Sequence, residues 1–356
     1  MLKDKTIYCI VTGANRTKTI GDFLVILQKF GFKNIILMPT ENSRPFLREA
    51  EIPEGITVRF DSITSKEKIP EEDVVVVAPC TFNTMGKIAN GDASSYPLSI
   101  LHAAIGKKKP IIVAFSMADH YWNHPLAENF RKTLSSFGIE LIWPEFLYSD
   151  NGEFIKLTMS PWEKVADSVC HKFEKCRFVS HQVSDRVNEG ILEKWADAFI
   201  KTGNTLEWQH FTRDTAGCLG VRIPEGILTT RTGAKVGKLS RDDLTLITKR
   251  DNKDIYWVGK FPPSSETPMI LELFEHFPAA QAIIHGHCTE ITYSPLANKY
   301  KTESYLSYGS FGQAEKLYEI LEENKIAIMR LHGEVVIGNS FDDALCKYLD
   351  LYHEMT

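Results

Sequence analysis

Short apolar runs alternate with helical patterns through the first half of this 356-residue chain. Runs of five or six residues rich in Val and Ile predict strands that are buried on both faces, and the segments between them repeat apolar residues at helical spacing. Because parallel strands need long crossover connections, this rhythm predicts an α/β fold with a doubly wound parallel sheet. The expected strands are 6–11, 34–38, 73–78, 111–115 and 139–143. The expected helices are 20–30, 81–90, 96–105, 124–137 and 160–176.

The second half of the chain has a different pattern, which predicts an α/β or α+β domain with a largely antiparallel sheet. Helices are expected at 187–202, 266–276 and 312–324, and strands at 217–222, 226–230, 255–258 and 280–285. A length of 356 residues also suits two domains, since a typical domain has about 150 residues. We therefore predict domains at 1–178 and 179–356, with a linker at 177–184.

Composition excludes several classes of protein. The chain has 43% hydrophobic and 24% charged residues, and its longest purely apolar runs, such as Val74 to Ala78, are far shorter than the ~20 residues of a membrane-spanning helix. The N-terminus lacks the segments of a secretory signal, so we predict a cytoplasmic protein. Seven scattered cysteines without a C-x-x-C pair predict neither a disulfide framework nor a structural zinc site. A net charge of −5 argues against a nucleic-acid partner.

Three histidines are candidate metal ligands. His285 and His287 follow an apolar strand at alternate positions, so their side chains share one face in extended chain. His332 follows a second apolar segment. Three histidines with an open fourth position are the ligand set of a catalytic divalent metal, most naturally zinc. A polar strand end is the alternative interpretation of the His-x-His pair taken alone.

Two hydroxyl-rich turns are candidates for an anion site. Ser264 and Ser265 precede a helix that begins near Glu266, and backbone N–H groups at a helix N-terminus attract anions. Thr232 and Gly233 lie in a second turn of this kind. The simpler alternative for the first turn is a capped helix start.

These motifs resemble the class II aldolase/adducin family in order and spacing over roughly residues 185–350. The resemblance implies a divalent metal, usually zinc with manganese or cobalt as alternatives, bound by the three histidines. It implies that Glu266 is the catalytic acid/base and that Ser264, Ser265, Thr232 and Gly233 bind a substrate phosphate. The implied reactions are retro-aldol cleavage, dehydration or epimerisation of a small sugar or sugar phosphate through a metal-stabilised enediolate.

One segment departs from that family. Where the family has Gly-Asn-x-Ser, this chain has Gly217-Cys218-Leu219-Gly220, which lacks the amide and the hydroxyl that help to hold phosphate. A substrate with another anionic or polar tail is therefore an alternative. Adducin-type members keep the fold without the metal, but retention of the three histidines and Glu266 favours an active metal site.

The segment 77–91 follows a predicted strand and opens a helix, which is either an ordinary βα turn or an anion site. Together with the Trp122-x-His124-Pro125 motif, it resembles the flavin-containing cysteine decarboxylase family, over about residues 4–175. The resemblance implies a flavoprotein-like fold that binds FMN with help from a neighbouring subunit. The residues that match flavin-contacting motifs are Gly13, Thr40, Ala78, Pro79, Thr81, Asn83 and Thr84.

The decarboxylase residues of that second family are missing. Residues 60–73 contain no histidine, Ala118 stands where an asparagine is expected, and 147–154 replaces a cysteine-containing segment. We therefore expect a domain that does not decarboxylate cysteine. Asp119 and His120 lie near the expected ligand edge, and we expect a solvated loop there; a role in a different reaction is the alternative.

The leading hypothesis is a metal-dependent lyase of the class II aldolase type with a fused flavoprotein-like domain. The alternative is an FMN-dependent enzyme, or a ligand-binding protein, whose aldolase-like half serves assembly. The two resemblances imply a homo-oligomer, commonly a trimer in one family and a tetramer in the other, with a small carbohydrate-like substrate. Threefold and fourfold axes cannot coincide in one small ring, so at least one domain is expected to depart from its family's assembly.

Overall fold

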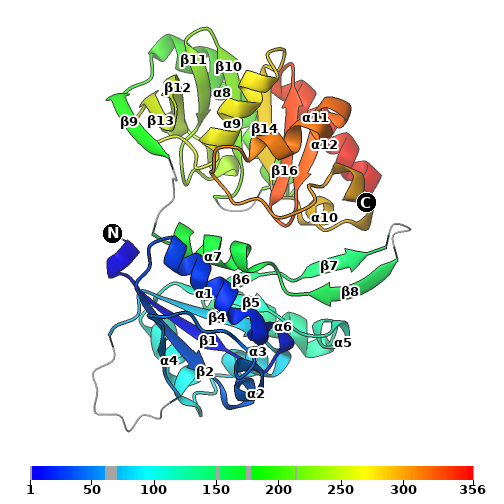
Figure 1. Ribbon diagram of the computed structural model, residues 1–356. Helices are drawn as coiled ribbons and strands as arrows, with labels where there is room; N and C mark the ends of the chain where they lie inside the picture. Colours follow the sequence, from blue (N-terminus) through cyan, green and yellow to red (C-terminus); the bar gives the residue numbers. More distant parts are fainter. Residues whose placement is uncertain (1, 61–69, 150–152, 174–177, 213–214, 356) are drawn as a thin grey trace. The chain divides into compact units, whose positions relative to one another are not determined.

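The computed structural model describes residues 2–60, 70–149, 153–173, 178–212 and 215–355. The chain divides into two compact units, Met1–Phe173 and Glu174–Thr356 (Figure 1).

The first unit is built on a parallel sheet of six strands in the order β3-β2-β1-β4-β5-β6. Its strands are β1 (Thr6–Val11), β2 (Asn34–Pro39), β3 (Thr57–Val58), β4 (Val74–Cys80), β5 (Ile111–Phe115) and β6 (Glu140–Ile142). Every residue of β1, β4 and β5 is buried, as expected for strands covered on both faces. The predicted doubly wound parallel sheet is confirmed.

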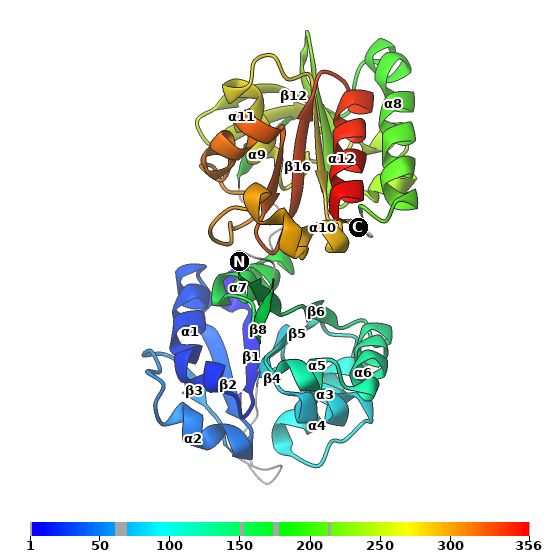
Figure 2. The same ribbon diagram turned by 90° about the vertical axis from the view of Figure 1, so that its right-hand side faces the viewer.

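Helices cover both faces of this sheet. The helices are α1 (Ile20–Lys29), α2 (Arg44–Leu47), α3 (Phe82–Ala89), α4 (Tyr96–Gly106), α5 (Asp119–Trp122), α6 (Pro125–Ser136) and α7 (Trp162–His171). Side chains of α1 and α7 form one core, in which Phe23 stacks on Trp162 at 5.2 Å between ring centroids. Those of α3, α4 and α6 form the other. Figure 2 shows α1 and this second group on opposite sides of the sheet. Each large apolar side chain buried in these layers contributes about 1.5–3 kcal/mol.

A two-stranded ribbon completes the first unit. Its strands, β7 (Glu145–Tyr148) and β8 (Phe154–Thr158), pair antiparallel. The ribbon follows β6 and leads into α7.

The second unit contains a sheet of eight strands in the order β15-β16-β14-β10-β11-β12-β13-β9. The strands are β9 (Val179–Ser184), β10 (Cys218–Ile223), β11 (Gly226–Thr230), β12 (Leu244–Asp251), β13 (Asp254–Val258), β14 (Ala282–Gly286), β15 (Ile326–Met329) and β16 (Gly333–Gly338). All neighbours pair antiparallel except β13 and β9. The predicted, largely antiparallel sheet is confirmed.

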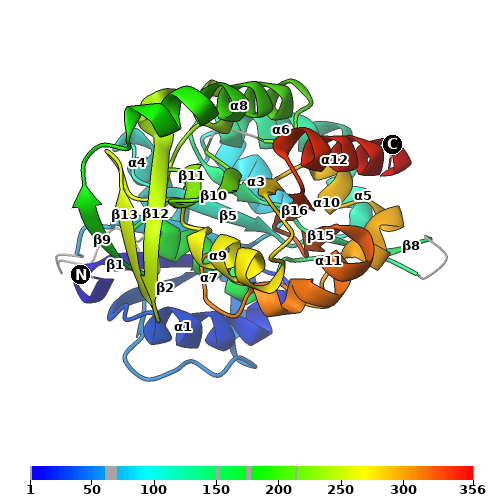
Figure 3. The ribbon, with the colours of Figure 1, turned by 90° about the horizontal axis from the view of Figure 1, so that it is seen from above.

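Helices lie on both faces of the second sheet as well. They are α8 (Glu189–Trp208), α9 (Thr267–His276), α10 (Thr289–Thr292), α11 (Tyr318–Asn324) and α12 (Phe341–Met355). Side chains of α8, α10 and α12 belong to one core, and those of α9 and α11 belong to the other. Figure 3 shows α8 and α12 along one side of the sheet and α9 and α11 along the other. Among the described residues, no helix combines the length and the apolar character needed to span a membrane.

The linker predicted at 177–184 is wrong for 179–184, which form strand β9, and residue 177 lies outside the described residues. The sequence Val-Ser-His-Gln-Val-Ser suits an edge strand, and it pairs parallel with β13. Strand β12 was also not predicted, although its first four residues are buried. The end of the helix expected at 160–176 falls partly on residues that are not described, and α7 ends at His171.

Candidate functional site

Three histidine side chains of the second unit converge on one point. His285 lies in β14, His287 follows that strand, and His332 lies in the turn between β15 and β16. Because β14 and β16 are neighbouring antiparallel strands, the last residues of β14 lie beside the first residues of β16, at the same end of the two strands. The candidate ligand atoms of the three side chains all lie within 4.8 Å of one another.

The imidazole of His285 has a defined proton arrangement. Its Nδ1 lies 2.8 Å from the carbonyl oxygen of Glu334, which can only accept, so Nδ1 carries the proton and Nε2 presents a lone pair. That Nε2 lies 3.0 Å from Nε2 of His287. Burial lowers the pKa of His285 to about 4, which keeps the ring neutral, as a metal ligand must be.

The residues present fit a tetrahedral divalent metal. Two nitrogens that are each about 2.0–2.1 Å from one zinc ion lie roughly 3.3 Å apart, close to the separation between His285 and His287. Among the residues that the structure describes, the group of candidate ligands consists of three imidazoles, which would leave one position for water or substrate, as in catalytic zinc sites.

Glu266, the predicted acid/base, lies beside this cluster. It is 6% exposed and immediately precedes α9. One carboxylate oxygen, Oε1, is 3.7 Å from Nε2 of His332. The other, Oε2, accepts a hydrogen bond of 3.4 Å from the backbone N–H of Gly309. The carboxylate is thus held within reach of anything bound at the three histidines.

The two hydroxyl-rich turns predicted as an anion site are brought together. The backbone N–H of Ser264 donates to the carbonyl of Thr230 at 3.0 Å, and that of Thr232 donates to Pro262 at 2.9 Å. The turn that contains Thr232 and Gly233 therefore lies alongside the one that contains Ser264 and Ser265. The hydroxyl of Ser264 accepts from the backbone N–H of Glu266 at 3.2 Å, which links the predicted anion site to the predicted acid/base.

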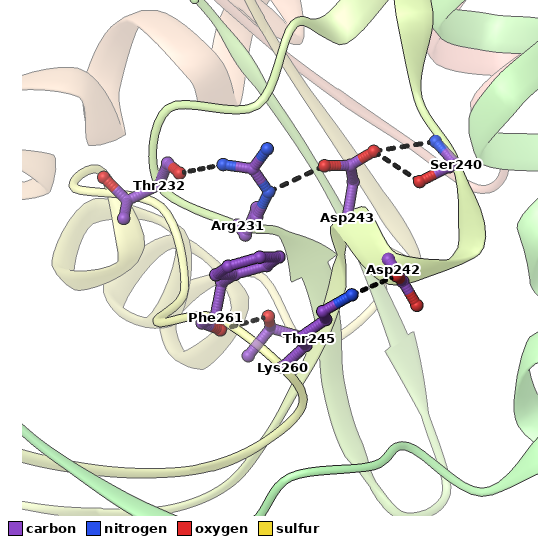
Figure 4. A network of polar contacts seen from close by, with 8 residues as sticks. All are labelled: Arg231, Thr232, Ser240, Asp242, Asp243, Thr245, Lys260 and Phe261. Atoms are coloured by element: carbon purple, nitrogen blue, oxygen red, sulfur yellow. Dashed lines mark hydrogen bonds and ion pairs between the residues drawn. The ribbon is translucent and has the colours of Figure 1, made fainter.

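A polar network holds the turn of Thr232 in place (Figure 4). The guanidinium of Arg231 donates to Asp243 Oδ1 at 2.6 Å and to the carbonyl of Thr232 at 2.9 Å, and it lies 4.6 Å from the centroid of the Phe261 ring. Asp243 also accepts from the N–H and hydroxyl of Ser240. Burial alone would raise the pKa of Asp243, but the bonds from Ser240 and Arg231 outweigh it and hold that pKa below its ordinary value.

Glu334 is a residue of this site that the sequence patterns did not predict. Its side chain is fully buried, and its carboxylate accepts from Tyr348, Thr292 and the backbone N–H of Cys288. Burial raises the pKa of Glu334 to about 7, against the effect of those hydrogen bonds. An acidic residue at the start of the apolar strand 333–338 was the available signal.

The first unit contains a cavity of about 1220 Å³ beyond the carboxyl ends of its strands. Of the residues predicted to contact flavin, Gly13, Thr40, Thr81, Asn83 and Thr84 line it. Ala78 and Pro79 lie in β4 and are not among the described lining residues. The carbonyl of Pro79 instead accepts from the hydroxyl of Thr12 at 2.7 Å.

Further residues line this cavity that the motifs did not identify. Phe82 and Tyr121 stack at 5.3 Å between centroids, and Arg16 lies 5.4 Å from the centroid of the Trp162 ring. Ala118 also lines the cavity, whereas Asp119 and His120 are exposed. Lining residues that the sequence patterns did not predict include Asn42, Ser95, Tyr121, Phe130, Leu157, Thr158 and Met159. The last three come from the ribbon segment, which only the fold brings to the cavity.

The fold and the two sites define a two-domain protein, in which an α/β domain with a ligand-sized cavity precedes a domain with a candidate three-histidine metal centre. The profile of the Flavoprotein family matches residues 1–174, and that of the Class II Aldolase and Adducin N-terminal domain matches residues 197–352. The first half of the chain thus matches a flavoprotein model and the second half a class II aldolase and adducin model, which confirms both resemblances.

Individual relatives fall into the same two groups. The chain is 33% identical over 117 residues to a phosphopantothenoylcysteine decarboxylase of Arabidopsis thaliana, covering 30% of this chain and 56% of that protein. It is 26% identical over 164 residues to an L-fuculose phosphate aldolase of Methanococcus maripaludis, covering 42% and 87%. It is 32% identical over 109 residues to a methylthioribulose-1-phosphate dehydratase of Gluconobacter oxydans, covering 30% and 51%. The chain thus spans about half the length of the first and third of these relatives.

Proposed function

We propose that the second unit is a divalent-metal-dependent lyase that acts on a small sugar phosphate or a related anionic sugar. The observation that carries this proposal is the convergence of three imidazoles with the carboxylate of Glu266, 3.7 Å from His332. The names of the relatives, an aldolase and a dehydratase acting on sugar phosphates, support the substrate class. Cleavage, dehydration and epimerisation all remain compatible with the site.

The protein's own residues divide the work between binding and proton transfer. His285, His287 and His332 would hold the metal, which when bound supplies electrophilic polarisation of a substrate carbonyl. Glu266 takes a proton from, or returns one to, the substrate atom next to that carbonyl. Its position is fixed from both sides, because its own backbone N–H donates to Ser264 and one carboxylate oxygen accepts from Gly309.

The paired turns would bind the anionic tail of the substrate. Ser264, Ser265 and Thr232 offer hydroxyls and backbone N–H groups, and Gly233 allows close approach to the main chain. Cys218, at the position of the family's asparagine, is 1% exposed and interacts with Ser264, which sets this turn apart from a site that offers an amide. Both phosphorylated and unphosphorylated substrates therefore need testing.

The cavity of the first unit favours a second candidate function, FMN binding. Its volume of about 1220 Å³ suits a nucleotide-sized ligand, and its lining combines the hydroxyls of Thr40, Thr81 and Thr84 with the aromatic pair of Phe82 and Tyr121. FMN, when bound, supplies redox chemistry that these side chains lack. In this alternative, flavin chemistry is the activity and the aldolase-like half serves assembly of a homo-oligomer.

A substrate panel tests both proposals. The full chain, loaded with zinc, manganese or cobalt, is assayed against phosphorylated and unphosphorylated ketoses and aldoses. We expect activity that a chelator removes and that Glu266→Gln lowers by about 10²–10⁴-fold while metal content is unchanged. Protein that takes up none of the three metals contradicts the lyase proposal. Activity that survives His285→Ala in a yellow, FMN-containing protein supports the alternative.

A further inference from the structure

One residue, Glu334, contacts the metal-ligand segment in two different ways. Its backbone carbonyl accepts from Nδ1 of His285 at 2.8 Å. Its carboxylate accepts from the backbone N–H of Cys288, the residue after His287, at 2.9 Å. The main chain of Glu334 therefore orients the imidazole of His285. Its side chain fixes the backbone of Cys288, next to His287.

Two hydroxyl groups complete the surroundings of this carboxylate. Tyr348, on α12, donates to Oε2 at 2.6 Å, and Thr292, at the end of α10, donates to Oε1. The carboxylate thus joins α12 and α10 to the turn that follows β14. All four residues are buried: Glu334, Cys288, Thr292 and Tyr348 are each 5% exposed or less.

The approach of Tyr348 depends on the residue between the two histidines. A Cβ atom on Gly286 would lie 2.1 Å from the Tyr348 hydroxyl oxygen, so only glycine leaves room for it. Gly286 is also opposite Glu334 in the pairing of β14 with β16. The hydroxyl, the carboxylate and the His285–His287 backbone therefore pack together in one small space.

A buried carboxylate is a costly way to stabilise a strand. An apolar side chain of similar size would avoid the desolvation cost, and a buried ionisable group by itself is weak evidence for stability. A fully hydrogen-bonded buried polar network does, however, restrict the residues that it contacts to one arrangement. Here the carboxylate network restricts the backbone of Cys288, and with it the turn that carries His287.

We propose that Glu334 is a positioning residue that preorganises His285 and His287 for metal binding, with Tyr348 as its partner. This inference rests on the proposed function in one respect, namely that the three histidines bind a metal. It goes further by assigning the affinity of the site to a residue that does not touch the metal. Groups that orient metal ligands in this way typically change metal affinity by about 10–100-fold when they are replaced.

The test measures the zinc affinity of the full-length, metal-free chain by competition with a chromophoric chelator. We expect Glu334→Gln to weaken zinc binding by about 10–100-fold. Tyr348→Phe, which removes one hydrogen bond and keeps the ring stacked on Phe211 at 4.4 Å, should weaken it by a smaller factor of about 2–10. The cobalt-substituted variants should also show an altered visible absorption spectrum, because the ligand geometry is less constrained.

The matched control is Tyr300→Phe. It also removes a tyrosine hydroxyl that donates to a glutamate, at 3.1 Å, but the acceptor, Glu354, lies near the end of α12 and not on a strand or turn that carries one of the three histidines. Its zinc affinity should equal that of the wild type. Thermal unfolding of the metal-free variants separates the effects, because a purely structural role of Glu334 would lower the melting temperature and leave the affinity unchanged.

The outcomes are distinct. Wild-type affinity in both folded variants, Glu334→Gln and Tyr348→Phe, would overturn the positioning role while leaving the metal-dependent function intact. If Glu334→Gln does not fold, Tyr348→Phe decides the question by the same measurement. A wild-type chain that binds neither zinc nor cobalt would overturn the proposed function and, with it, this inference.

Discussion

The backbone N–H of Gly309 lies 3.4 Å from Oε2 of Glu266, 43 residues earlier in the chain. Gly309 has a positive φ of 63°, and a Cβ atom there would lie 2.6 Å from the carbonyl oxygen of Ser265. The loop that contains Gly309 therefore packs directly on the turn that contains both the proposed acid/base and part of the proposed anion site. The position of the Glu266 carboxylate depends on this packing.

Gly309→Ala is expected to lower kcat with little change in metal content. The added methyl group would push the loop away from Ser265 and move the backbone N–H of residue 309 away from the Glu266 carboxylate. We therefore expect kcat to fall by about 10-fold or more, which corresponds to about 1.4 kcal/mol of lost transition-state stabilisation. Gly312→Ala is the control, because Gly312 also has a positive φ, of 82°, but has open space around its Cβ position. Equal losses in the two variants would show that backbone strain alone is responsible.

Metal binding should raise the melting temperature of the second unit. A ligand that binds only the folded state stabilises it by about 2.7 kcal/mol at 100 times its dissociation constant. His287→Ala should abolish this zinc-dependent shift, measured by scanning calorimetry with and without zinc. His353→Ala, at an exposed histidine on α12, should keep it. A shift that persists in His287→Ala would place the stabilising zinc elsewhere.

Strands β1, β2, β4, β5 and β6 of the first unit could be predicted from the sequence because buried strands leave continuous apolar runs, whereas β3, β7 and β8, which are more exposed, were not predicted. Strand 6–11 and strand 111–115 were predicted with their observed bounds. Strand β9 was mistaken for a linker because an edge strand is mostly exposed and therefore lacks that apolar pattern. Its partner β13 lies 70 or more residues away in sequence, and no local pattern reports such a pairing.

The candidate site also contains residues that the sequence patterns could predict and residues that they could not. The convergence of His285, His287 and His332 could be predicted because the histidines follow strands at recognisable positions. Glu334 and Gly309 could not, since their roles depend on contacts with Tyr348 and Glu266 that only the tertiary fold brings about. Motifs thus identified the groups proposed to carry the chemistry, whereas the groups proposed to orient them emerged from packing.

The network of Arg231 and Asp243 gives a pH-dependent prediction. Because the folded-state pKa of Asp243 lies below its unfolded value, its stabilisation is fully present above about pH 4 and is lost as the pH falls through the folded-state pKa. Asp243→Asn should therefore cost about 1–3 kcal/mol at pH 7 and make unfolding less sensitive to acid. Asp242→Asn, which removes only the exposed ion pair with Lys260, should cost about 0–1 kcal/mol. Thermal unfolding of both variants between about pH 3 and pH 7 provides the comparison.

The cavity of the first unit predicts a flavin-binding phenotype that depends on Gly13. A Cβ atom at Gly13 would lie 2.6 Å from the backbone oxygen of Asn42, and both residues line the cavity, so Gly13→Ala must displace one wall. We expect the wild-type chain to bind FMN, measured by the change in flavin fluorescence, and Gly13→Ala to bind it about 10-fold or more weakly, equivalent to 1.4 kcal/mol. Gly106→Ala is the control, because Gly106 ends α4 with open space around its Cβ position and helices favour alanine over glycine. Equal FMN affinity in Gly13→Ala and the wild type would mean that flavin does not occupy this cavity.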